Sequence, residues 1–482
     1  MAARPDVARR ASLIALCAAL GACAVGPDYV KPQVDTPDAY RFVQNDVADT
    51  ANAAWWEQFG DPVLNALIAE ALAHNRGVKI AAANVDAAAA LLTQTRSQFF
   101  PQLGYSAGET RQRASASVNP VAGKLTPNPS SVYETLAGAS WEIDLWGRIR
   151  RQSEAAHANL LASEQARRGV ILSLVAQVAS GYLQLRALDY QLEVAERTLK
   201  AYGETLRLFE LQHEHGVVSR MTVEQARSSY ETAAAQIPQI TMQIAQTENA
   251  LSILVGSNPR AIARGKALDA LAVPPVPAGL PSQLLERRPD IAQAEQALIA
   301  ANAQIGAAKA LYFPTISLTG TYGSQSAALD DLFSGPARVW SFAAGLTGPL
   351  FTGGAVHAEV RGAEAAKDAA LLQYEAAVQS AFADVDNALV ARQELQQQVG
   401  SQERLVHALS EYERLATLQY KGGYTPYSTV LQAQQSLFPQ ELNLAQTRFA
   451  LFNALVNLYK VTGGGWVDIA DRMTDAAATG SP

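Results

Sequence analysis

The chain has 482 residues, of which 49% are hydrophobic and 17% are charged. The charged share is below the roughly 25% usual for soluble domains, and the hydrophobic share excludes an intrinsically disordered chain. The formal net charge of −7 has the wrong sign for holding nucleic-acid phosphates, so we expect no nucleic-acid partner. Both cysteines, Cys17 and Cys23, lie close to the N-terminus, which leaves no disulfide framework or zinc cluster downstream.

The N-terminus has the pattern of a bacterial signal peptide. Basic residues up to Arg10 precede an apolar run from Ala11 to Leu20, which is too short to cross a bilayer. The run ends in Leu20-Gly21-Ala22-Cys23, which resembles a lipoprotein signal, with cleavage before Cys23 and a diacylglycerol on its thiol. Ordinary secretory cleavage is the alternative. We predict a signal peptide over 1–22 and, over 23–60, an extended segment anchored by N-palmitoyl and S-diacylglycerol groups on Cys23.

The remainder of the chain is internally duplicated. Three landmarks recur in the same order: Phe99-Phe100-Pro101 as Tyr312-Phe313-Pro314 at a numbering offset of 213, Asp144-Leu145-Trp146-Gly147 as Pro349-Leu350-Phe351-Thr352 at 205, and Gly216–Val223 as Gly423–Val430 at 207. A period this long indicates a duplicated domain and not a short-repeat array. We predict repeats over 61–270 and 282–466, a proline-rich linker over 271–281 and a flexible tail over 467–482.

The first predicted repeat is a helix, two strands, a long helix and a shorter helix. Asp61-Pro62 offers an N-cap followed by the residue best tolerated at the first helical position, and Pro101 ends the first helix. The two strands lie within 103–146. Over 148–215 no proline interrupts apolar residues at three- and four-residue spacing, which predicts a helix roughly 100 Å long. The shorter helix covers 222–255.

The second predicted repeat has the same order of elements. A helix begins near Ser282 and is followed by two strands within 315–350, a long helix over 355–420 and a helix over 425–462. Pro238 and Pro439 lie inside the shorter helices of the two repeats, where each is expected to kink or interrupt its helix. The long helices of the two repeats far exceed the usual globular helix in length and indicate spanning struts.

Alternating side chains mark the predicted strands. Trp141 and Ile143 alternate with polar residues in the first repeat, as do Trp340 and Phe342 in the second. One apolar and one polar face are expected when lipid lies outside and water inside, although a half-buried soluble sheet gives the same pattern. Two strands per repeat give four per chain, whereas outer-membrane barrels begin at eight. Several chains would therefore have to share one barrel.

Seven motifs span nearly the whole chain. They are Cys23-Ala24-Val25-Gly26-Pro27-Asp28-Tyr29, Trp56 with Phe59-Gly60-Asp61-Pro62, Phe100-Pro101, Trp141-Glu142-Ile143-Asp144-Leu145-Trp146-Gly147, Arg288-Pro289-Asp290-Ile291, Phe313-Pro314 and Gly463-Gly464-Gly465-Trp466. In this order they resemble the outer membrane factors of tripartite efflux systems, in particular the NodT-like or OprM-like lipoprotein branch of the TolC-like superfamily.

The resemblance implies an α+β membrane protein that works as a homotrimer. Each chain would contribute four strands to a transmembrane β-barrel in the cell outer membrane, and its long helices to a periplasmic α-helical barrel. The implied partners are a periplasmic adaptor protein, an inner-membrane pump of the RND type and outer membrane lipid. The implied function is passive conduction of drugs or other small toxic compounds from the pump to the exterior.

The resemblance also places the inner mouth of the duct at the turns after the two long helices. One turn contains Gly216–Arg220, and the other contains Gly422–Tyr427. Glycines suit a sharp reversal between antiparallel helices whatever the function. Arg220, Tyr424 and Tyr427 are the candidate tip residues, although Arg220 with Glu224 four residues on is equally an ordinary surface pair.

Related channels ring the aperture with an aspartate and, three residues later, an arginine on the last helix. Here those positions hold Gln432 and Gln435, and the apolar residue that precedes them is Ser428. We therefore expect a gate without charged groups at these three positions. Amide hydrogen bonds repeated around three copies would then support the closed state.

Enzyme chemistry and metal binding have little support in the sequence. The 6 histidines are scattered, and the two nearest, His213 and His215, do not share a helix face. Phosphate-loop, nucleophile-elbow and HExxH motifs are not found in the sequence. We expect no cofactor, no metal and no catalytic residue. Three alternatives to the efflux duct stay open: a duct for type I protein secretion, a lipid-anchored coiled-coil structural or adhesion protein, and a single-chain porin.

Overall fold

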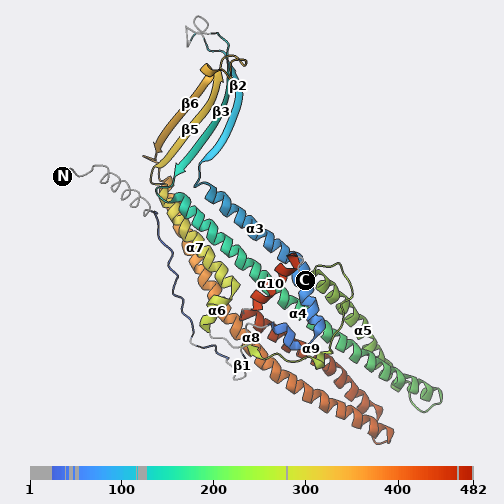
Figure 1. The fold of residues 1–482 in the computed structure, drawn as a ribbon. Coiled ribbons are helices and arrows are strands. Elements are labelled where there is room, and N and C mark those ends of the chain that lie inside the picture. Colours follow the sequence, from blue (N-terminus) through green and yellow to red (C-terminus); the bar gives the residue numbers. More distant parts are fainter. Residues whose placement is uncertain are drawn as a thin grey trace. The chain divides into compact units, whose positions relative to one another are not determined.

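The computed structural model describes residues 24–37, 39–42, 47–48, 54–115, 117, 127–277, 281–463 and 466–479. Cys23 and the predicted signal peptide lie outside the described residues. The chain forms two compact units (Figure 1). The first contains the described residues up to Gln33, Val85–Ser163 and Ala294–Tyr374, and the second contains Val34–Asn84, Glu164–Gln293 and the described residues from Glu375. Each unit takes pieces from both repeats, so the repeats are not separate compact units.

The first unit contains one antiparallel sheet of four strands. These are β2 (Gln102–Gln112), β3 (Ser130–Ile143), β5 (Thr315–Ser326) and β6 (Arg338–Thr347), the last preceded by the short turn η3 (Gly335–Ala337). The strand order is β2-β3-β5-β6, so each repeat supplies one hairpin and β3 joins the hairpins by pairing with β5 (Figure 1). The predicted four strands are confirmed. The two edge strands, β2 and β6, come from different repeats.

Four helix ends adjoin the sheet within the first unit. The helices α3 (Arg76–Ser97) and α7 (Pro289–Ala310) lead into β2 and β5, whereas α4 (Arg148–Glu214) and α8 (Ala355–Lys421) follow β3 and β6. A buried cluster of four alanines joins α4 to α7: Ala155, Ala158, Ala300 and Ala303. Small side chains let two helix backbones approach closely, which explains the abundance of alanine here.

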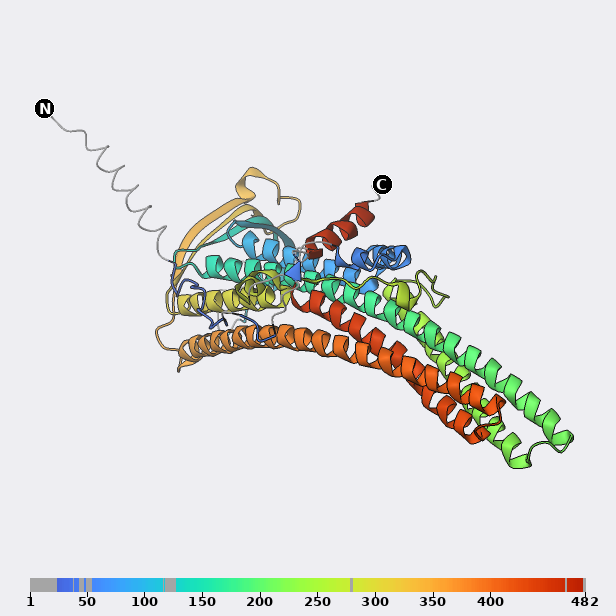
Figure 2. The same cartoon turned by 90° about the horizontal axis from the view of Figure 1, so that it is seen from below.

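In the second unit, α4 and α8 continue and each reverses into a shorter helix. Their lengths are 67 residues each, and the shorter helices α5 (Arg220–Leu254) and α9 (Tyr427–Val461) have 35 residues each. Figures 1 and 2 both show α5 returning along α4 and α9 returning along α8. Pro238 and Pro439 do not interrupt these helices, contrary to the stronger form of our expectation.

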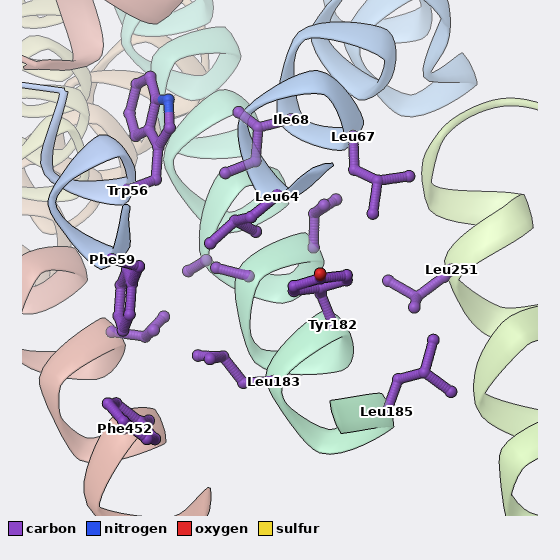
Figure 3. Packing of buried hydrophobic residues seen from close by; sticks show 14 of the residues in the cluster. Trp56, Phe59, Leu64, Leu67, Ile68, Tyr182, Leu183, Leu185, Leu251 and Phe452 are labelled. Carbon is purple, nitrogen blue, oxygen red and sulfur yellow. The ribbon is translucent and has the colours of Figure 1, made fainter. Parts of the chain in front are cut away.

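The core of the second unit lies around the middle of α4. Figure 3 shows side chains of the turn η1 (Trp55–Phe59), α2 (Pro62–His74), α4, α5 and α9 meeting there, including Leu64, Tyr182, Leu251 and Phe452. Among the described helices, α4 alone has an 18-residue stretch apolar enough to cross a membrane, with a mean hydropathy of 1.3. Because 67% of that stretch is buried inside the protein, its apolar character serves the core.

Aromatic rings close one side of this core. The ring of Trp55 stacks on Tyr459 with centroids 5.3 Å apart and meets Trp466 edge to face at 6.0 Å. Trp466 begins the helix α10 (Trp466–Thr479), whose Asp471 pairs with Arg167 at 2.9 Å. The predicted flexible tail over 467–482 was therefore wrong for the described residues. Burial of Trp466 at 0% exposure, followed by ion pairs to α4, holds the segment in a helix.

In two of the motifs that carry the family resemblance, buried polar contacts explain why particular residues are present. The carboxylate of Asp61 is 0% exposed and accepts hydrogen bonds from the Val63 and Lys266 backbone N–H groups and from the Tyr182 hydroxyl, at 2.9, 3.0 and 2.7 Å. It thus caps α2, as predicted, and also ties α2 to α4 and to the loop at 265–266. Leaving such a group without partners costs about 1 to 3 kcal/mol, so the motif requires aspartate here.

Arg288 organises the second of these motifs. Its guanidinium contacts the carboxylates of Asp290 and Asp384 at 2.7 and 3.1 Å and donates to the Val461 carbonyl at 3.2 Å. Burial is the largest influence and would raise the pKa of Asp290, but the hydrogen bond from Arg288, its positive charge and the backbone N–H groups together outweigh burial, so the pKa is lowered. The group therefore keeps its charge and fastens α7, α8 and α9 to one another.

Two helices predicted as continuous are divided. The first, over 61–98, breaks at Asn75, whose side chain accepts from the Val78 N–H at 3.1 Å and so caps α3. The helix predicted from 282 divides at Arg288 into α6 (Pro281–Arg287) and α7, because the residue before Pro289 is kept out of the helical region. In the predicted linker, β4 (Val276–Pro277) pairs in parallel with β1 (Val47–Ala48), after the short turn η2 (Leu268–Ala270).

The structure also corrects the offset between the repeats at the end of the sheet. The helices α4 and α8 begin at Arg148 and Ala355, which gives an offset of 207, and the glycines that precede them, Gly147 and Gly354, both have positive φ. The alignment at an offset of 205, which matched Trp146 with Phe351, was therefore wrong. That alignment relied on the similarity of two aromatic residues. The equivalent positions are instead the two glycines with positive φ, a conformation that glycine adopts more readily than other residues.

Candidate functional site

The sheet has one apolar face, which the strand register defines. Trp141 lies opposite Leu318, and Leu318 lies opposite Ala344, so all three project from the same side. By the same alternation this face carries these further side chains: Leu103, Tyr105, Ile143, Ile316, Tyr322, Trp340, Phe342 and Leu346. Trp340 and Phe342 are 75% and 72% exposed. The predicted shared face of Trp141, Ile143, Trp340 and Phe342 is confirmed.

The opposite face of the sheet is polar and has small side chains. Apart from Val132, Leu136, Val339 and Ala343, its positions hold Gly, Ser, Thr, Gln or Glu. Glu142 on this face receives two hydrogen bonds from Arg148, at 3.1 and 2.8 Å, which fix the start of α4. A sheet with one apolar and one hydrated face suits a barrel wall between lipid and water.

The junction between β3 and α4 is held by an aromatic side chain. Trp146 stacks on Phe313 with ring centroids 4.6 Å apart, and its indole N–H donates to the Pro314 carbonyl at 2.7 Å. Asp144 caps α4 by accepting from the Ile149 and Arg150 N–H groups at 3.1 and 2.8 Å. The first hairpin is thus fastened to the base of the second by contacts inside one chain.

Residues 24–31, which we call the N-terminal strap, run along α4 and α7 in the first unit. Gly26 and Gly306 touch: a Cβ added at Gly26 would lie 2.4 Å from the Gly306 Cα atom. The guanidinium of Arg151, itself buried, pairs with Asp28 at 2.7 Å. Asn302 also donates to the Pro27 carbonyl at 3.0 Å. These contacts explain the residues of the first motif, which begins at Cys23.

Both ends of the strap are also fixed. At its far end, Tyr29 and Lys31 donate to the carboxylate of Glu295 at 3.2 and 2.9 Å. At its near end, Ala24 lies against Gly147, where an added Cβ would come within 3.0 Å of the Ala24 Cα atom. The residue next to the predicted lipid attachment site at Cys23 is therefore held at the base of the sheet.

At the tip, Tyr427 is buried in a small apolar cluster of the second unit. Its ring meets Phe209 edge to face at 4.5 Å and Tyr420 at 5.6 Å, which joins α4, α8 and α9. Burial, with a smaller contribution from Tyr420, raises the pKa of Tyr427 to about 12. Tyr424, the other predicted tip tyrosine, is 85% exposed. The structure therefore places only one of the two tyrosines in the packed tip.

The remaining predicted gate residues lie on the surface of a single chain. Ser428, Gln432 and Gln435 are all exposed and follow the i, i+4, i+7 spacing that gives one helix face. Arg220 lies 3.6 Å from Glu224, and the two side chains are 82% and 52% exposed, as expected for an ordinary surface ion pair. The structure thus brings the three α9 residues onto one stripe, and it does not bring Arg220 into a buried site.

A buried polar contact that the sequence patterns did not indicate lies beside the tip. The Tyr202 hydroxyl donates to the Gln434 carbonyl at 3.2 Å, and the Gln434 side chain donates to Glu413 at 3.4 Å. These residues lie on α4, α8 and α9. The sequence signal was that Gln434 falls on the apolar side of α9, in line with Tyr427 and Val430.

The described residues contain no group of three or more His, Cys, Asp and Glu side chains that could hold a metal ion. The perturbed groups belong to structural contacts such as Arg288 with Asp290. What the geometry does offer is a two-faced sheet with free edges and a pair of helical hairpins. Such an arrangement suits the wall of a channel.

Comparison with known proteins identifies the family to which the chain belongs. The family described as outer membrane efflux protein matches residues 67–257 and 280–464. The chain belongs to this family. The toluene efflux pump outer membrane protein TtgC of Pseudomonas putida is 37% identical over 470 residues, with 96% of this chain and 97% of TtgC covered. The cation efflux system protein CusC of Escherichia coli is 35% identical over 464 residues, with 94% and 98% covered.

A solved structure shows the same fold. The open state of the MtrE outer membrane channel of Neisseria gonorrhoeae superposes with a TM-score of 0.84 at 34% identity, covering 92% of this chain and 99% of MtrE. The chain is thus a TolC-like outer membrane efflux channel that extends into the periplasm. It is the trimeric outer component of a tripartite system, with a periplasmic adaptor and an inner-membrane pump. The family consists of channel proteins.

Proposed function

We propose that the protein passively conducts small toxic organic compounds from an RND-type pump to the exterior, and that it has no catalytic activity. The observation that carries this proposal is the four-stranded sheet, which has one apolar face and two unpaired edges, β2 and β6. In lipid every backbone polar group needs a partner, so the edges must be paired. Four strands from each of three copies close a barrel of twelve.

The family relatives differ in what their names say they export. TtgC is named for toluene and CusC for cations. We favour organic compounds for this chain, since its sequence is slightly more similar to the toluene protein over a slightly longer alignment. Conduction of proteins by a type I system is the second candidate, and the pump found with the chain decides between them.

The decisive experiment joins assembly to transport. Protein purified in detergent should migrate as a trimer unless heated, and should form conducting channels in planar bilayers. In a host without its own outer membrane channel, the chain and its pump should restore resistance to organic solvents. A monomer or dimer without conductance would overturn the proposal, and restored copper resistance with no solvent resistance would change the substrate class to cations.

The orientation of the sheet in the wall has a separate test. Phe342 and Ala343 are neighbours on β6 that project from opposite faces, and both are exposed in one chain. We expect Phe342→Cys in the assembled channel to react with a lipid-soluble maleimide, and Ala343→Cys to react with a water-soluble one that enters the lumen. Equal reactivity of the two cysteines towards both reagents would contradict the assigned faces.

We further propose that Cys23 carries the lipid anchor. The tetrad Leu20-Gly21-Ala22-Cys23 motivates this proposal, and the strap that begins at Ala24 supports it by holding the adjacent residue at the base of the sheet. Cys23→Ala should abolish labelling by radioactive palmitate, while trimers still form through the barrel. Label that persists on Cys23→Ala would locate the lipid on another residue.

Finally, we propose that the tip closes the duct through uncharged contacts. Ser428, Gln432 and Gln435 form an exposed stripe on α9, which three copies would direct at one another around the aperture. Tyr424 and Arg220 are the exposed tip groups that an adaptor protein would meet first. Tyr427 supports the tip from within by packing on Phe209.

A further inference from the structure

Arginines stand above the apolar band on both edge strands of the sheet. On β2, Arg111 projects from the same face as Tyr105, and on β6, Arg338 projects from the same face as Trp340. Arg113 directly follows β2, and all three arginines are exposed. They lie at the hairpin ends of the strands, opposite the ends that adjoin the helices. In an outer membrane channel whose helices extend into the periplasm, this is the external end.

The height of the arginines matches the outer border of the membrane. Eight positions separate Leu346, near the inner end of the apolar face, from Arg338, which corresponds to about 27 Å along the strand. At the usual tilt of barrel strands this is about 20 Å of height, close to the apolar band of about 25 Å. Trp340 and Tyr322, which lie opposite each other on β6 and β5, form an aromatic border two positions inside Arg338.

Within one chain the two arginine positions are apart, because β3 and β5 separate the edge strands by roughly 14 Å in total. Between copies they meet, and the duplication gives the register. In the chain, Tyr133 of β3 pairs with Ser326 of β5. The matching Phe-Pro motifs set β2 equivalent to β5 at an offset of 213, and the glycines before the two long helices set β3 equivalent to β6 at 207. The two hairpin registers agree with these offsets taken together.

The repeat geometry therefore pairs Trp340 (133 + 207) with Arg113 (326 − 213) of the next copy. Arg338 then lies diagonal to this Arg113, and Phe342 lies opposite Arg111 of the next copy. A register shifted by two positions in one direction places Arg338 directly opposite Arg113, whereas the opposite shift leaves Arg338 four positions away from it. The same face carries one carboxylate nearby, Glu109, which accepts from the Ser131 hydroxyl at 3.1 Å. At the described strand positions three positive charges face one negative charge, so this face of the paired edges is net positive, and the exposed carboxylates of Asp330 and Asp331 lie beyond it in the loop between β5 and β6.

We propose that this junction binds the phosphate groups of lipopolysaccharide in the outer leaflet. The inference rests on the proposed trimeric barrel, since neither edge strand holds the site alone. Each guanidinium group can donate two parallel hydrogen bonds to the oxygens of one phosphate, which favours phosphate over other groups of the lipid. Basic clusters of this kind hold anionic lipid headgroups on other membrane proteins, and Trp340 supplies an aromatic surface beside the acyl chains.

The first test leaves the protein unchanged and varies the lipid. Trimers in nanodiscs of phosphatidylethanolamine are given traces of diphosphoryl lipid A or of lipid A with both phosphates removed, and bound lipid is counted by native mass spectrometry. We expect up to three diphosphoryl lipid A molecules per trimer, bound at least about ten-fold more tightly than the dephosphorylated form. Equal binding of the two lipids would overturn the proposal.

The second test locates the site. The double variant Arg113→Gln with Arg338→Gln should lose the preference for diphosphoryl lipid A by about ten-fold or more. The matched control is Arg207→Gln with Arg404→Gln, which removes two exposed arginines from the long helices and should bind as the unmodified protein does. A double rim variant that keeps the full preference would place the lipid site elsewhere and refute the junction.

Assembly is measured on the same samples, so the two proposals fail separately. Loss of the heat-sensitive trimer or of conductance in the unmodified protein would count against the proposed channel. A conducting trimer without a preference for diphosphoryl lipid A would count against the lipid site alone. As a check on the register, Arg113→Cys with Trp340→Cys should form disulfides between copies, and a protein that forms none would contradict the derived pairing.

Discussion

The two junctions between strand and helix, one in each repeat, are held in different ways. After β3, Trp146 stacks on Phe313 and donates to Pro314, and Asp144 caps α4. After β6, Leu350 and Phe351 are 105% and 91% exposed, and Gly353 and Gly354 lead into α8 with positive φ. One junction is completed inside the chain, whereas the other presents its apolar side chains to the surroundings.

The difference shows where a duplicated chain needs another copy of itself. The first repeat finds its neighbour in the second repeat, since β3 pairs with β5. Among the described residues no strand pairs with the outer edge of β6, so the equivalent neighbour is the first repeat of another copy. Phe351 is exposed, and Phe100 at the base of β2 is 67% exposed. Exposed aromatic side chains at both edges of the sheet are expected when another copy covers them in the trimer.

The largest effect is expected at the completed junction. Trp146→Ala removes a stacked, half-buried indole and its hydrogen bond, and should lower the free energy of unfolding by about 2 to 3 kcal/mol. Phe351→Ala should change the unfolding of the chain by less than about 0.5 kcal/mol, because its ring is exposed. Denaturant unfolding followed by circular dichroism measures both.

The same pair of variants separates folding from assembly. Phe351→Ala should lower the temperature at which the trimer dissociates in detergent, although it leaves chain unfolding unchanged. Trp146→Phe, which keeps a ring against Phe313, should recover most of the loss seen with alanine. Equal unfolding energies for Trp146→Ala and Phe351→Ala would mean that the two junctions do not differ as described.

The tips of the two repeats offer a second comparison. At the offset of 207, buried Tyr427 of the second repeat corresponds to exposed Arg220 of the first. The pKa of Tyr427 is raised to about 12, so its contribution to stability is complete below its ordinary value near 10 and is lost as the pH rises to 12. We expect conductance to become pH-dependent between pH 10 and 12.

Tyr427→Phe is the matched variant, since it keeps the ring against Phe209 without a group that ionises. It should remove the alkaline transition while conductance at pH 7 stays unchanged. Tyr424→Phe, at an exposed position in the same turn, serves as the control and should leave the transition in place. A transition that survives Tyr427→Phe would have to come from another group.

A smaller effect is expected at Gln432 and Gln435. Neither amide ionises, so single-channel recordings between pH 7 and 4 should show no acid-triggered opening that depends on these positions. Gln432→Asp places three carboxylates around the aperture with no cation beside them, so their mutual repulsion should favour the open state at pH 7, and protonation at lower pH should favour closure. Acid-dependent opening that persists when both residues are alanine would place the gate elsewhere in the channel.

The smallest effect is expected at Arg220. Its pair with Glu224 at 3.6 Å is largely exposed, and such pairs contribute between about 0 and 1 kcal/mol. Arg220→Ala should therefore leave the thermal stability of the trimer within about 1 °C of the unmodified value. A loss comparable to that of Trp146→Ala would show that Arg220 has a buried partner in the assembly.

Local patterns in the sequence predicted much of this fold, because their causes are local. The alternation around Trp141 and Phe342 gave the sheet faces, and the cap at Asp61 with the proline after it gave the start of α2. Uninterrupted apolar spacing gave α4 and α8 to within one residue at each end. Each of these patterns depends on neighbours a few residues away.

What the sequence did not predict depends on residues far apart in the chain. Lys31 meets Glu295 across 264 residues, and Tyr202 meets Gln434 across 232, so neither contact leaves a local pattern. The helix α10 was missed because a short polar segment folds only where Trp466 is buried and Asp471 finds Arg167. The gate residues were predicted from the resemblance to known channels. They are exposed in a single chain, so any contacts that close the gate must form between copies in the trimer.

The N-terminal strap sets how the chain first meets the membrane. Ala24 is held against Gly147, so a lipid on Cys23 would be joined to the base of the sheet by about one residue, or roughly 4 Å of chain. Once the four strands of one chain have paired, so short a tether keeps their sheet at the bilayer surface, at a high effective concentration for pairing with the edges of other copies. The anchor would then aid assembly. Three chains lose translational entropy when they close one barrel, and chains already held at the membrane would have lost part of that entropy beforehand.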